Sequence, residues 1–250
     1  MADIDGEGLH ETEREIEALG AAVHSTVLDV ADRDAVYDWA DEVTRKFGGV
    51  NLIVNTGVSL SAIVGDMAYE DMRWPLGIDL YGMIYGTKAF LPYLKQAGEG
   101  HIVNISSVLD LIATPTQSAY TITKFAIRGF TECLRLELDI GESGIGATVV
   151  YPGGVRTNIA KDARVSESLL EEMGASKEEM VVNFEHSARI LPEEAAAKII
   201  KGIKGNRNRV LIGRETYFLD MLQRLMPSAY LKIMTGLFRL SYRLVRRKAR

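Results

Sequence analysis

The sequence predicts an α/β protein with a doubly wound parallel sheet, and three observations support this. Short apolar runs alternate with longer segments of helical periodicity through most of the chain. The runs at 51–55 and 101–105 are almost continuously apolar, as expected for strands buried on both faces. The length of 250 residues, 47% hydrophobic and 25% charged, suits one globular domain.

Local signals place each element. Strands are expected at 21–30, 51–55, 101–105, 145–151 and 209–212. Helices are expected at 7–19, 32–47, 69–96 and 118–138. Gly20 and the pair Gly48 and Gly49 end the first two helices, because glycine readily adopts the backbone conformation that follows a helix. The mostly polar segment 158–192 is expected to be a mobile insertion with short helices.

The charge is unevenly distributed. Residues 1–214 are expected to form the domain and residues 215–250 a basic amphipathic extension. After Asp220 the sequence has eight Lys and Arg and no acidic residue, whereas the first 220 residues carry 21 basic and 34 acidic residues. The acidic body argues against nucleic-acid binding. The extension suits either peripheral membrane contact or a lid packed on a substrate cleft.

Several classes are excluded. One cysteine, Cys133, rules out an internal disulfide and is expected to pack as a small hydrophobe. The four histidines are scattered, so no metal site is expected. The start of the chain shows no signal peptide, and no run of about 18 apolar residues suggests a membrane span. A cytoplasmic protein is therefore expected, with membrane-peripheral association as the variant.

Tyr120 and Lys124 are four residues apart on an expected helix, so their side chains share one face. A phenol with a pKa near 10 is a poor base at neutral pH, and a neighbouring ammonium favours the phenolate. Such a pair supports general acid/base catalysis. Ser107 follows the strand at 101–105, where the carboxyl ends of parallel strands bind ligands. Its hydroxyl can donate to a substrate carbonyl, and Ser106 fits this role less well by spacing.

With these motifs in place, the chain resembles the short-chain dehydrogenases/reductases, whose fold is Rossmann-like. Five stretches match in order and approximate spacing: Leu28-Asp-Val30, Val54-Asn-Thr-Gly57, Ile102-Val-Asn-Ile-Ser-Ser107, Tyr120-Thr-Ile-Thr-Lys124 and Pro152-Gly-Gly-Val-Arg-Thr157. The resemblance implies Tyr120 as general acid/base, Ser107 as the group that polarises the substrate oxygen, and Lys124 as the group that favours the phenolate and binds the nicotinamide ribose. The implied reaction is hydride transfer between a nicotinamide cofactor and a secondary alcohol or ketone.

The resemblance also implies cofactor contacts. Asp29 and Val30 would contact the adenine, and Asn55 and Gly57 would line the cofactor cleft. The nicotinamide carboxamide and the phosphates would be held by the segment that contains Pro152, Gly153, Val155 and Thr157. Asp3 corresponds to the acidic residue that binds the adenosine ribose hydroxyls, which favours NAD over NADP. A solvated acid near the chain start is the alternative for Asp3.

The sequence departs from the family at its start. Family members open with a strand, a glycine-rich turn, a helix and a second strand, and this sequence matches only from the end of that second strand. The missing first strand is central, so the expected strands at 21–30 and 51–55 would be left open or paired with each other. The pyrophosphate would lose its helix N-terminus. Two explanations stay open: a start codon internal to a longer protein, or a true truncation without cofactor binding.

Two further departures concern the site. One residue is missing from the loop at Asn55, where the family usually has Asn-Asn-Ala-Gly, which shifts the assignment of Asn55. Asp79 replaces an asparagine that supports a water chain to the lysine, and an acid beside Lys124 would favour the ammonium.

Two functions are therefore compared. The first is an NAD(P)-dependent oxidoreductase that acts on an alcohol or carbonyl, expected to be apolar because Leu109, Leu111 and Tyr151 would shape the cleft. The second is a catalytically silent chain that serves as a binding or dimerisation module. A homodimer or homotetramer is expected, formed through the long helices at 69–96 and 118–138.

Overall fold

A computed structural model describes residues 1–248, with side chains to Leu240, and its centre is a parallel sheet of four strands. The strands lie in the order β3 (Leu52–Asn55), β5 (Gly100–Ile105), β6 (Ile145–Pro152) and β8 (Arg209–Ile212). Every pairing is parallel, with Ile53 opposite Ile102 and Val149 opposite Arg209. The predicted α/β class is confirmed.

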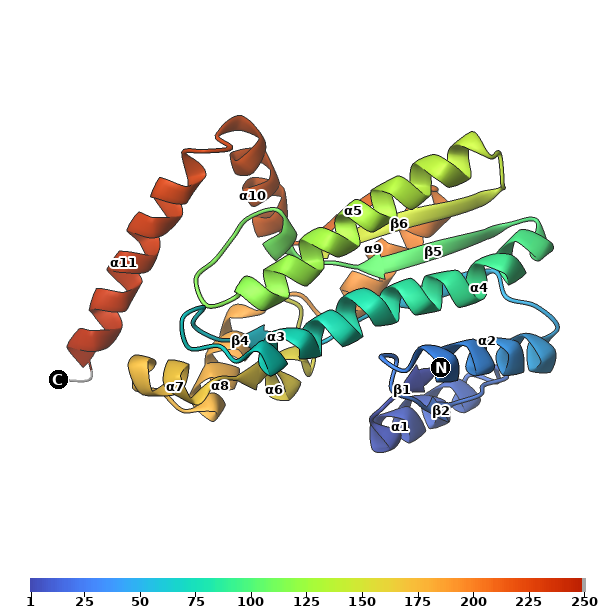
Figure 1. Ribbon diagram of the computed structural model, residues 1–250, viewed down its shortest axis with the longest axis horizontal. Coiled ribbons are helices and arrows are strands. Elements are labelled where there is room, and N and C mark those ends of the chain that lie inside the picture. The colour runs from blue at the N-terminus through green and yellow to red at the C-terminus, as the bar shows by residue number, and fades with distance from the viewer. Residues whose placement is uncertain (249–250) are drawn as a thin grey trace.

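Helices cover both faces of this sheet (Figure 1). On one face lie α4 (Met83–Ala97) and α5 (Ser118–Ile140), whose Phe90, Leu94 and Leu134 pack on Ile102 and Ala147. On the other lies α9 (Pro192–Lys204), which packs on the adjacent strand residues Val103, Val150 and Val210. Successive strand residues thus enter opposite cores, as a doubly wound sheet requires.

The first two strands form a separate sheet. β1 (Ala2–Asp3) pairs with β2 (Thr26–Val27), and neither pairs with β3 among the described residues. The strand predicted at 21–30 is therefore much shorter than expected. The strand at 51–55 is not buried on both faces, because Leu52 and Val54 are each 44% exposed. The sequence allowed these two strands either to be left open or to pair with each other. The structure shows them open, with Val27 also exposed.

The first two helices are confirmed with their caps. α1 (Gly6–Ala18) begins at Asp5, whose carboxylate accepts the amides of Glu7 and Gly8. α2 (Arg33–Phe47) begins after Asp32 and ends at Gly48, which has a positive φ of 77°. α2 carries Trp39, whose ring lies edge-on to Phe90 of α4, with centroids 5.1 Å apart. This contact attaches the N-terminal unit to the main core.

The long helix predicted at 69–96 is divided into three parts. α3 (Tyr69–Pro75) leads into a π-helical segment, η1 (Leu76–Gly82), which continues into α4. Pro75 has no amide hydrogen to donate, which weakens the helical ladder at this point. At the other end Gly82 lies against Val30, where an added Cβ would meet a side-chain methyl at 2.8 Å. The wide turns direct Asp79 into the interior, with no exposed surface.

The insertion has the predicted short helices and one unpredicted strand. Its elements are α6 (Ile159–Asp162), β7 (Arg164–Val165), α7 (Glu167–Met173) and α8 (Lys177–Ser187). β7 pairs with β4 (Leu60–Ser61), which follows β3 in the chain. The insertion therefore returns to the carboxyl edge of the main sheet.

The extension forms two helices, α10 (Arg214–Leu225) and α11 (Tyr230–Lys248), on either side of Pro227. Its last two residues lie outside the described part of the chain. No helix in the described residues combines the length and apolarity needed to cross a bilayer. Cys133 is exposed rather than packed, which corrects the prediction for this residue, because it lies on the outer face of α5.

Candidate active site

Lys124 occupies the centre of the predicted site. The α5 helix brings its ammonium to the end of β5, where Nζ donates to the carbonyl of Ile105 at 3.3 Å. The same nitrogen lies 5.1 Å from the centroid of the Tyr120 ring. Ser107 lies two residues beyond Ile105, so the serine and the helical pair meet at the carboxyl edge of the sheet.

Asp79 binds this lysine from the opposite side. Its Oδ2 lies 3.3 Å from Lys124 Nζ and accepts the hydroxyl of Thr123 at 3.0 Å, while its Oδ1 accepts the amide of Val58 at 2.7 Å. Burial alone would lower the pKa of Lys124, but the charges of Tyr120 and Asp79 outweigh it and the pKa is raised. The lysine is therefore an ammonium, as predicted for an acid at position 79. The hydrogen bond from Thr123 to Asp79 was not predicted, although the position of Thr123 next to Lys124 in the sequence pointed to this site.

Gly57 completes this end of the site. A Cβ at residue 57 would overlap the Asp79 carboxylate and lie 3.2 Å from Lys124 Nζ. Only glycine lets the loop after β3 approach the ion pair so closely. The ends of β3 and β5, the π-helical segment and α5 therefore converge on one buried charge pair.

The two serines after β5 have different surroundings. Ser106 is buried and its hydroxyl contacts the Asp110 carboxylate and the carbonyl of Lys124, so it serves the structure. Ser107 Oγ accepts the amide of Leu109 at 3.1 Å and, within the described residues, its hydrogen has no assigned acceptor. Ser107 is 7% exposed, and its hydroxyl hydrogen, unlike that of Ser106, is not taken up by a described protein group. The predicted order of the two serines stays a prediction.

Asp110 is a buried acid that the sequence did not reveal. It ends the short 3-10 turn η2 (Val108–Asp110) and has no exposed surface. Among the described residues its Oδ1 has no hydrogen-bond partner, and Arg128 lies 3.8 Å away. Burial raises the pKa of the Asp110 carboxyl to about 7, against smaller opposing effects of Ser106 and Arg128.

The predicted adenosine contacts lie in the N-terminal unit. Asp3, at the end of β1, is exposed and its carboxylate accepts the amide of Asp5 at 3.0 Å. Asp29 follows β2, is also exposed and accepts the amide of Ala31. Val30 instead packs against Gly82 and the main core. The carboxylates are thus free to meet ribose hydroxyls, whereas the Val30 side chain is largely occupied by packing.

The remaining cofactor residues differ in their availability. Asn55 donates to Asn104 at 2.8 Å and to Thr87 at 3.3 Å, so the structure turns its amide into the interior rather than toward a cleft. Gly153 lies against Glu215 with no room for a Cβ, and Pro152 pairs with Ile212 in the sheet. Val155 packs in the core on the α9 face. Thr157 is exposed after β6.

Three of these residues fit contacts to a dinucleotide. Asp3 and Asp29 present exposed carboxylates at the ends of β1 and β2, and Thr157 is exposed in the loop after β6. Gly57 keeps the loop after β3 close against the Asp79–Lys124 pair. No group of metal-ligating side chains occurs within the described residues.

The predicted lining of a substrate cleft needs correction. Tyr151 has no exposed surface and Leu111 is 3% exposed, and both pack with Val149 in a small core behind β6. Of the three residues proposed to shape the cleft, only Leu109 is partly accessible. The expectation of an apolar substrate therefore loses most of its basis in these side chains.

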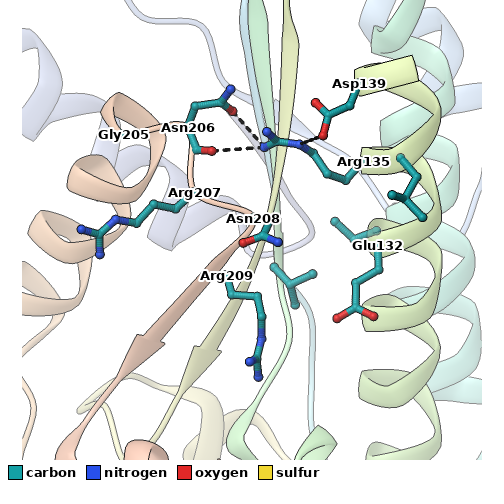
Figure 2. Close-up of a pocket in the computed structure, with 11 residues that line it drawn as sticks. Glu132, Arg135, Asp139, Gly205, Asn206, Arg207, Asn208 and Arg209 are labelled. Carbon is teal, nitrogen blue, oxygen red and sulfur yellow. Dashed lines mark hydrogen bonds and ion pairs between the residues drawn. The ribbon is translucent and has the colours of Figure 1, made fainter. Parts of the chain in front are cut away.

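A cavity of about 550 Å3 lies elsewhere. Figure 2 shows it between the C-terminal half of α5 and the loop before β8, lined by Glu132, Arg135 and Asn206. Arg135 donates to Asp139 at 2.7 Å and to Asn206 Oδ1 at 2.9 Å. None of the predicted catalytic residues lines this cavity, and its central arginine already has protein acceptors. It is not the active site.

Fold and site together define a class: a parallel α/β enzyme with a Ser–Tyr–Lys group at the carboxyl edge of its sheet. The family model of the short chain dehydrogenases matches residues 1–168. SadH from Mycobacterium tuberculosis, named as an oxidoreductase, is 39% identical over 238 residues, which cover 94% of this chain and 84% of SadH. The C alpha-dehydrogenase of Sphingobium sp. is 32% identical, over 82% of this chain and 69% of that protein.

A solved structure agrees with this fold. The short-chain dehydrogenase/reductase from Burkholderia phymatum, crystallised with NAD, superposes with a TM-score of 0.81 at 24% identity, over 89% of this chain and 82% of that one. The present chain belongs to the short-chain dehydrogenase family, whose members are oxidoreductases.

Proposed function

We propose that the protein is an NAD(P)-dependent oxidoreductase that interconverts a secondary alcohol and a ketone. The observation that carries this proposal is the buried ammonium of Lys124, bound by Asp79 and next to Tyr120 at the carboxyl edge of the sheet, where Ser107 follows β5. A cation held beside a phenol in the interior suits proton transfer between that phenol and a substrate oxygen. The other groups of the site have little need of such a cation.

Each side chain has one task. Ser107 donates its hydroxyl hydrogen to the substrate oxygen and orients it. Tyr120 gives a proton to that oxygen during reduction and takes it back during oxidation. Lys124 keeps a positive charge beside the phenol, and Asp79 holds Lys124 in place. The nicotinamide supplies the hydride chemistry when it is bound.

We assign NAD as the preferred cofactor because Asp3 places an open carboxylate at the end of β1. Such a group accepts ribose hydroxyls and repels a 2′-phosphate. The relative from Burkholderia phymatum was crystallised in complex with NAD, which is consistent with this choice. The substrate is an alcohol or carbonyl compound, and we propose that its apolar part contacts Leu109 and the insertion.

A second candidate is a chain without activity that serves as a binding or dimerisation module. One observation favours it: β2 and β3 do not pair, and Val27, Leu52 and Val54 are exposed along the two open edges. A cofactor would have to span this break to reach both Asp3 and Lys124. The separation weakens the phosphate region of the site.

Titration of NADH fluorescence with the 250-residue chain distinguishes the two candidates. We expect saturable binding of NADH, weaker binding of NADPH, and loss of the NADH preference in Asp3→Asn. The matched control is Asp34→Asn, an exposed acid in α2. No binding at high micromolar NADH would reject the enzyme and favour the module.

We also propose a homodimer or homotetramer through the long helices. The outer face of α5 carries a row of exposed residues at helical spacing: Ile122, Phe125, Cys133, Leu136 and Ile140. A row of this length on a surface helix is typical of a subunit interface. Sedimentation velocity of Leu136→Glu, compared with the native chain, tests whether this face of α5 forms the interface. An unchanged oligomeric state would exclude this face as the interface.

A further inference from the structure

The α10 helix is anchored on one side only. Thr216 is buried and donates to the carbonyl of Ile212, and Asp220 binds Arg209 of β8 at 2.9 Å. Thr216 and Asp220 are four residues apart, so they define the face of α10 that contacts the sheet. A second set, also at helical spacing, faces away and is 58–75% exposed: Tyr217, Phe218, Met221 and Leu225.

The α11 helix has two distinct faces. Leu231 is 50% exposed, and Leu237 and Leu240 are each 58% exposed, while Tyr230 at its start is the one buried side chain among residues 230–240. Figure 1 shows α11 running from the end of α10 as an arm beside the sheet layers. Lys232 and Arg239 are seven residues apart and so share one side of the helix, and Met234 and Leu237 lie across from them. The helix is therefore amphipathic and its apolar side is uncovered in the described chain.

The charges around this apolar surface have one sign. Beyond Asp220 the sequence has eight basic residues and no acid, whereas the first 220 residues have a formal charge of −13. A negatively charged bilayer would attract the extension and repel the body, and so would orient the molecule with α10 and α11 toward it. A second copy of the chain presents the same positive extension, which opposes pairing of two such arms.

We propose that α10 and α11 bind the surface of an anionic lipid bilayer. The helices lie in the plane of the interface, with the apolar residues among the acyl chains and Lys232 and Arg239 near the headgroups. Neither helix spans the bilayer, in agreement with the absence of a spanning helix in the described residues. The active-site edge of the sheet is then held close to the bilayer by the residues that anchor α10.

The physical terms set the size of the effect. A basic residue near an anionic surface strengthens partitioning about fivefold, and this attraction is screened over a Debye length of about 10 Å at 0.1 M salt. Reversing two charges should therefore weaken partitioning at least about tenfold. Replacing two exposed leucines removes burial of apolar surface and should weaken it by a similar factor on any bilayer.

Co-sedimentation with vesicles tests the proposal on the native 250-residue chain. Vesicles of phosphatidylcholine alone are compared with vesicles that contain 30% phosphatidylglycerol, at low and high salt. One variant, Lys232→Glu with Arg239→Glu, reverses the basic side, and its control is Lys198→Glu with Lys201→Glu on the exposed side of α9. The other, Leu237→Ser with Leu240→Ser, removes apolar surface, and its control is Ile4→Ser with Leu19→Ser at exposed positions of the body.

We expect the native chain to bind the phosphatidylglycerol vesicles, and we expect this binding to fall as the salt concentration rises. Both extension variants should weaken the binding about tenfold, and both controls should leave it unchanged. Circular dichroism and a thermal melt show that each variant is folded. No sedimentation with either vesicle, or equal sedimentation of variants and controls, would overturn the proposal. Sedimentation velocity tests the alternative that α11 contacts a second copy of the chain. If Leu237→Ser with Leu240→Ser dissociates an oligomer and the native chain does not bind vesicles, α11 is a contact between copies and not a membrane surface.

Discussion

The ammonium of Lys124 and the carboxylate of Asp79 form a buried ion pair with a separation of 3.3 Å, and their side chains are 3% and 0% exposed. Two charges so far from water are stable only where further polar groups satisfy them. Here the carbonyl of Ile105 accepts from the lysine, and the amide of Val58 and the hydroxyl of Thr123 donate to the aspartate. The pair therefore connects β5, α5, the π-helical segment and the loop after β3.

Replacing Asp79 should show how strongly this pair holds the site together. Asp79→Ala leaves the lysine ammonium and the Val58 amide without partners, and we expect a loss of about 3–5 kcal/mol in the free energy of unfolding. Asp79→Asn keeps an acceptor for Val58, so we expect less than half of that loss. Urea denaturation measures both. The control is Asp139→Ala, which removes a half-exposed pair with Arg135 and should cost at most about 1 kcal/mol. Equal losses for Asp79→Ala and the control would contradict the assignment.

Tyr120→Phe removes the phenol oxygen and keeps the ring beside Lys124. We expect turnover of secondary alcohols to fall at least about 1000-fold, because general acid/base catalysis contributes factors of about 100 to 10,000. We expect the dissociation constant of NADH to change less than about twofold, because in the proposed arrangement Lys124 makes the ribose contact. Absorbance at the nicotinamide band measures turnover, and fluorescence titration measures binding. Turnover close to that of the native protein would rule out the proposed mechanism.

Gly57→Ala tests the close approach of the loop to the ion pair. The added methyl overlaps the Asp79 carboxylate, so either the loop or the pair must move, and we expect a loss of about 1–3 kcal/mol in stability together with impaired NADH binding. Gly49→Ala is the control, because a Cβ there meets no atom within 4 Å. Its stability should be unchanged or higher by up to about 1 kcal/mol. The interpretation fails if both variants melt and bind alike.

Asp110 should make stability depend on pH. Its pKa of about 7 in the folded chain is above the ordinary value of 3.8, so the folded state binds this proton more tightly. The stabilisation is complete below about pH 3.8 and is lost as the pH rises through 7, with a slope of up to about 1.4 kcal/mol per pH unit. Asp110→Asn lacks this titration. We therefore expect the stability of the variant, relative to the native chain, to rise between pH 4 and pH 8 in urea denaturation.

The pH series on Asp110→Asn also has a clear negative outcome. A stability difference between this variant and the native chain that stays constant from pH 4 to pH 8 would show that Asp110 does not titrate in this range. Asp139→Asn, a substitution at a half-exposed acid, is measured in parallel as the reference.

The sequence by itself determined the parallel α/β fold, the position of most elements and the Ser107, Tyr120 and Lys124 group. These depend on local properties: periodicity, the four-residue spacing on one helix, and a serine that directly follows a strand. Glycine at helix ends also acts locally, and Gly20 and Gly48, with φ of 75° and 77°, lie just past the ends of the first two helices as predicted.

Only the tertiary structure decided which of these groups are available. The break between β2 and β3, the inward turn of Asn55, the burial of Tyr151 and the exposure of Cys133 depend on what packs beside each residue, and residue type does not specify it. The same holds for Asp110, because an acid in a short turn is ordinarily solvated and only the surrounding core removes its water. Burial is a property of the assembled fold, and it is burial that separates the groups that perform chemistry from those that hold the fold.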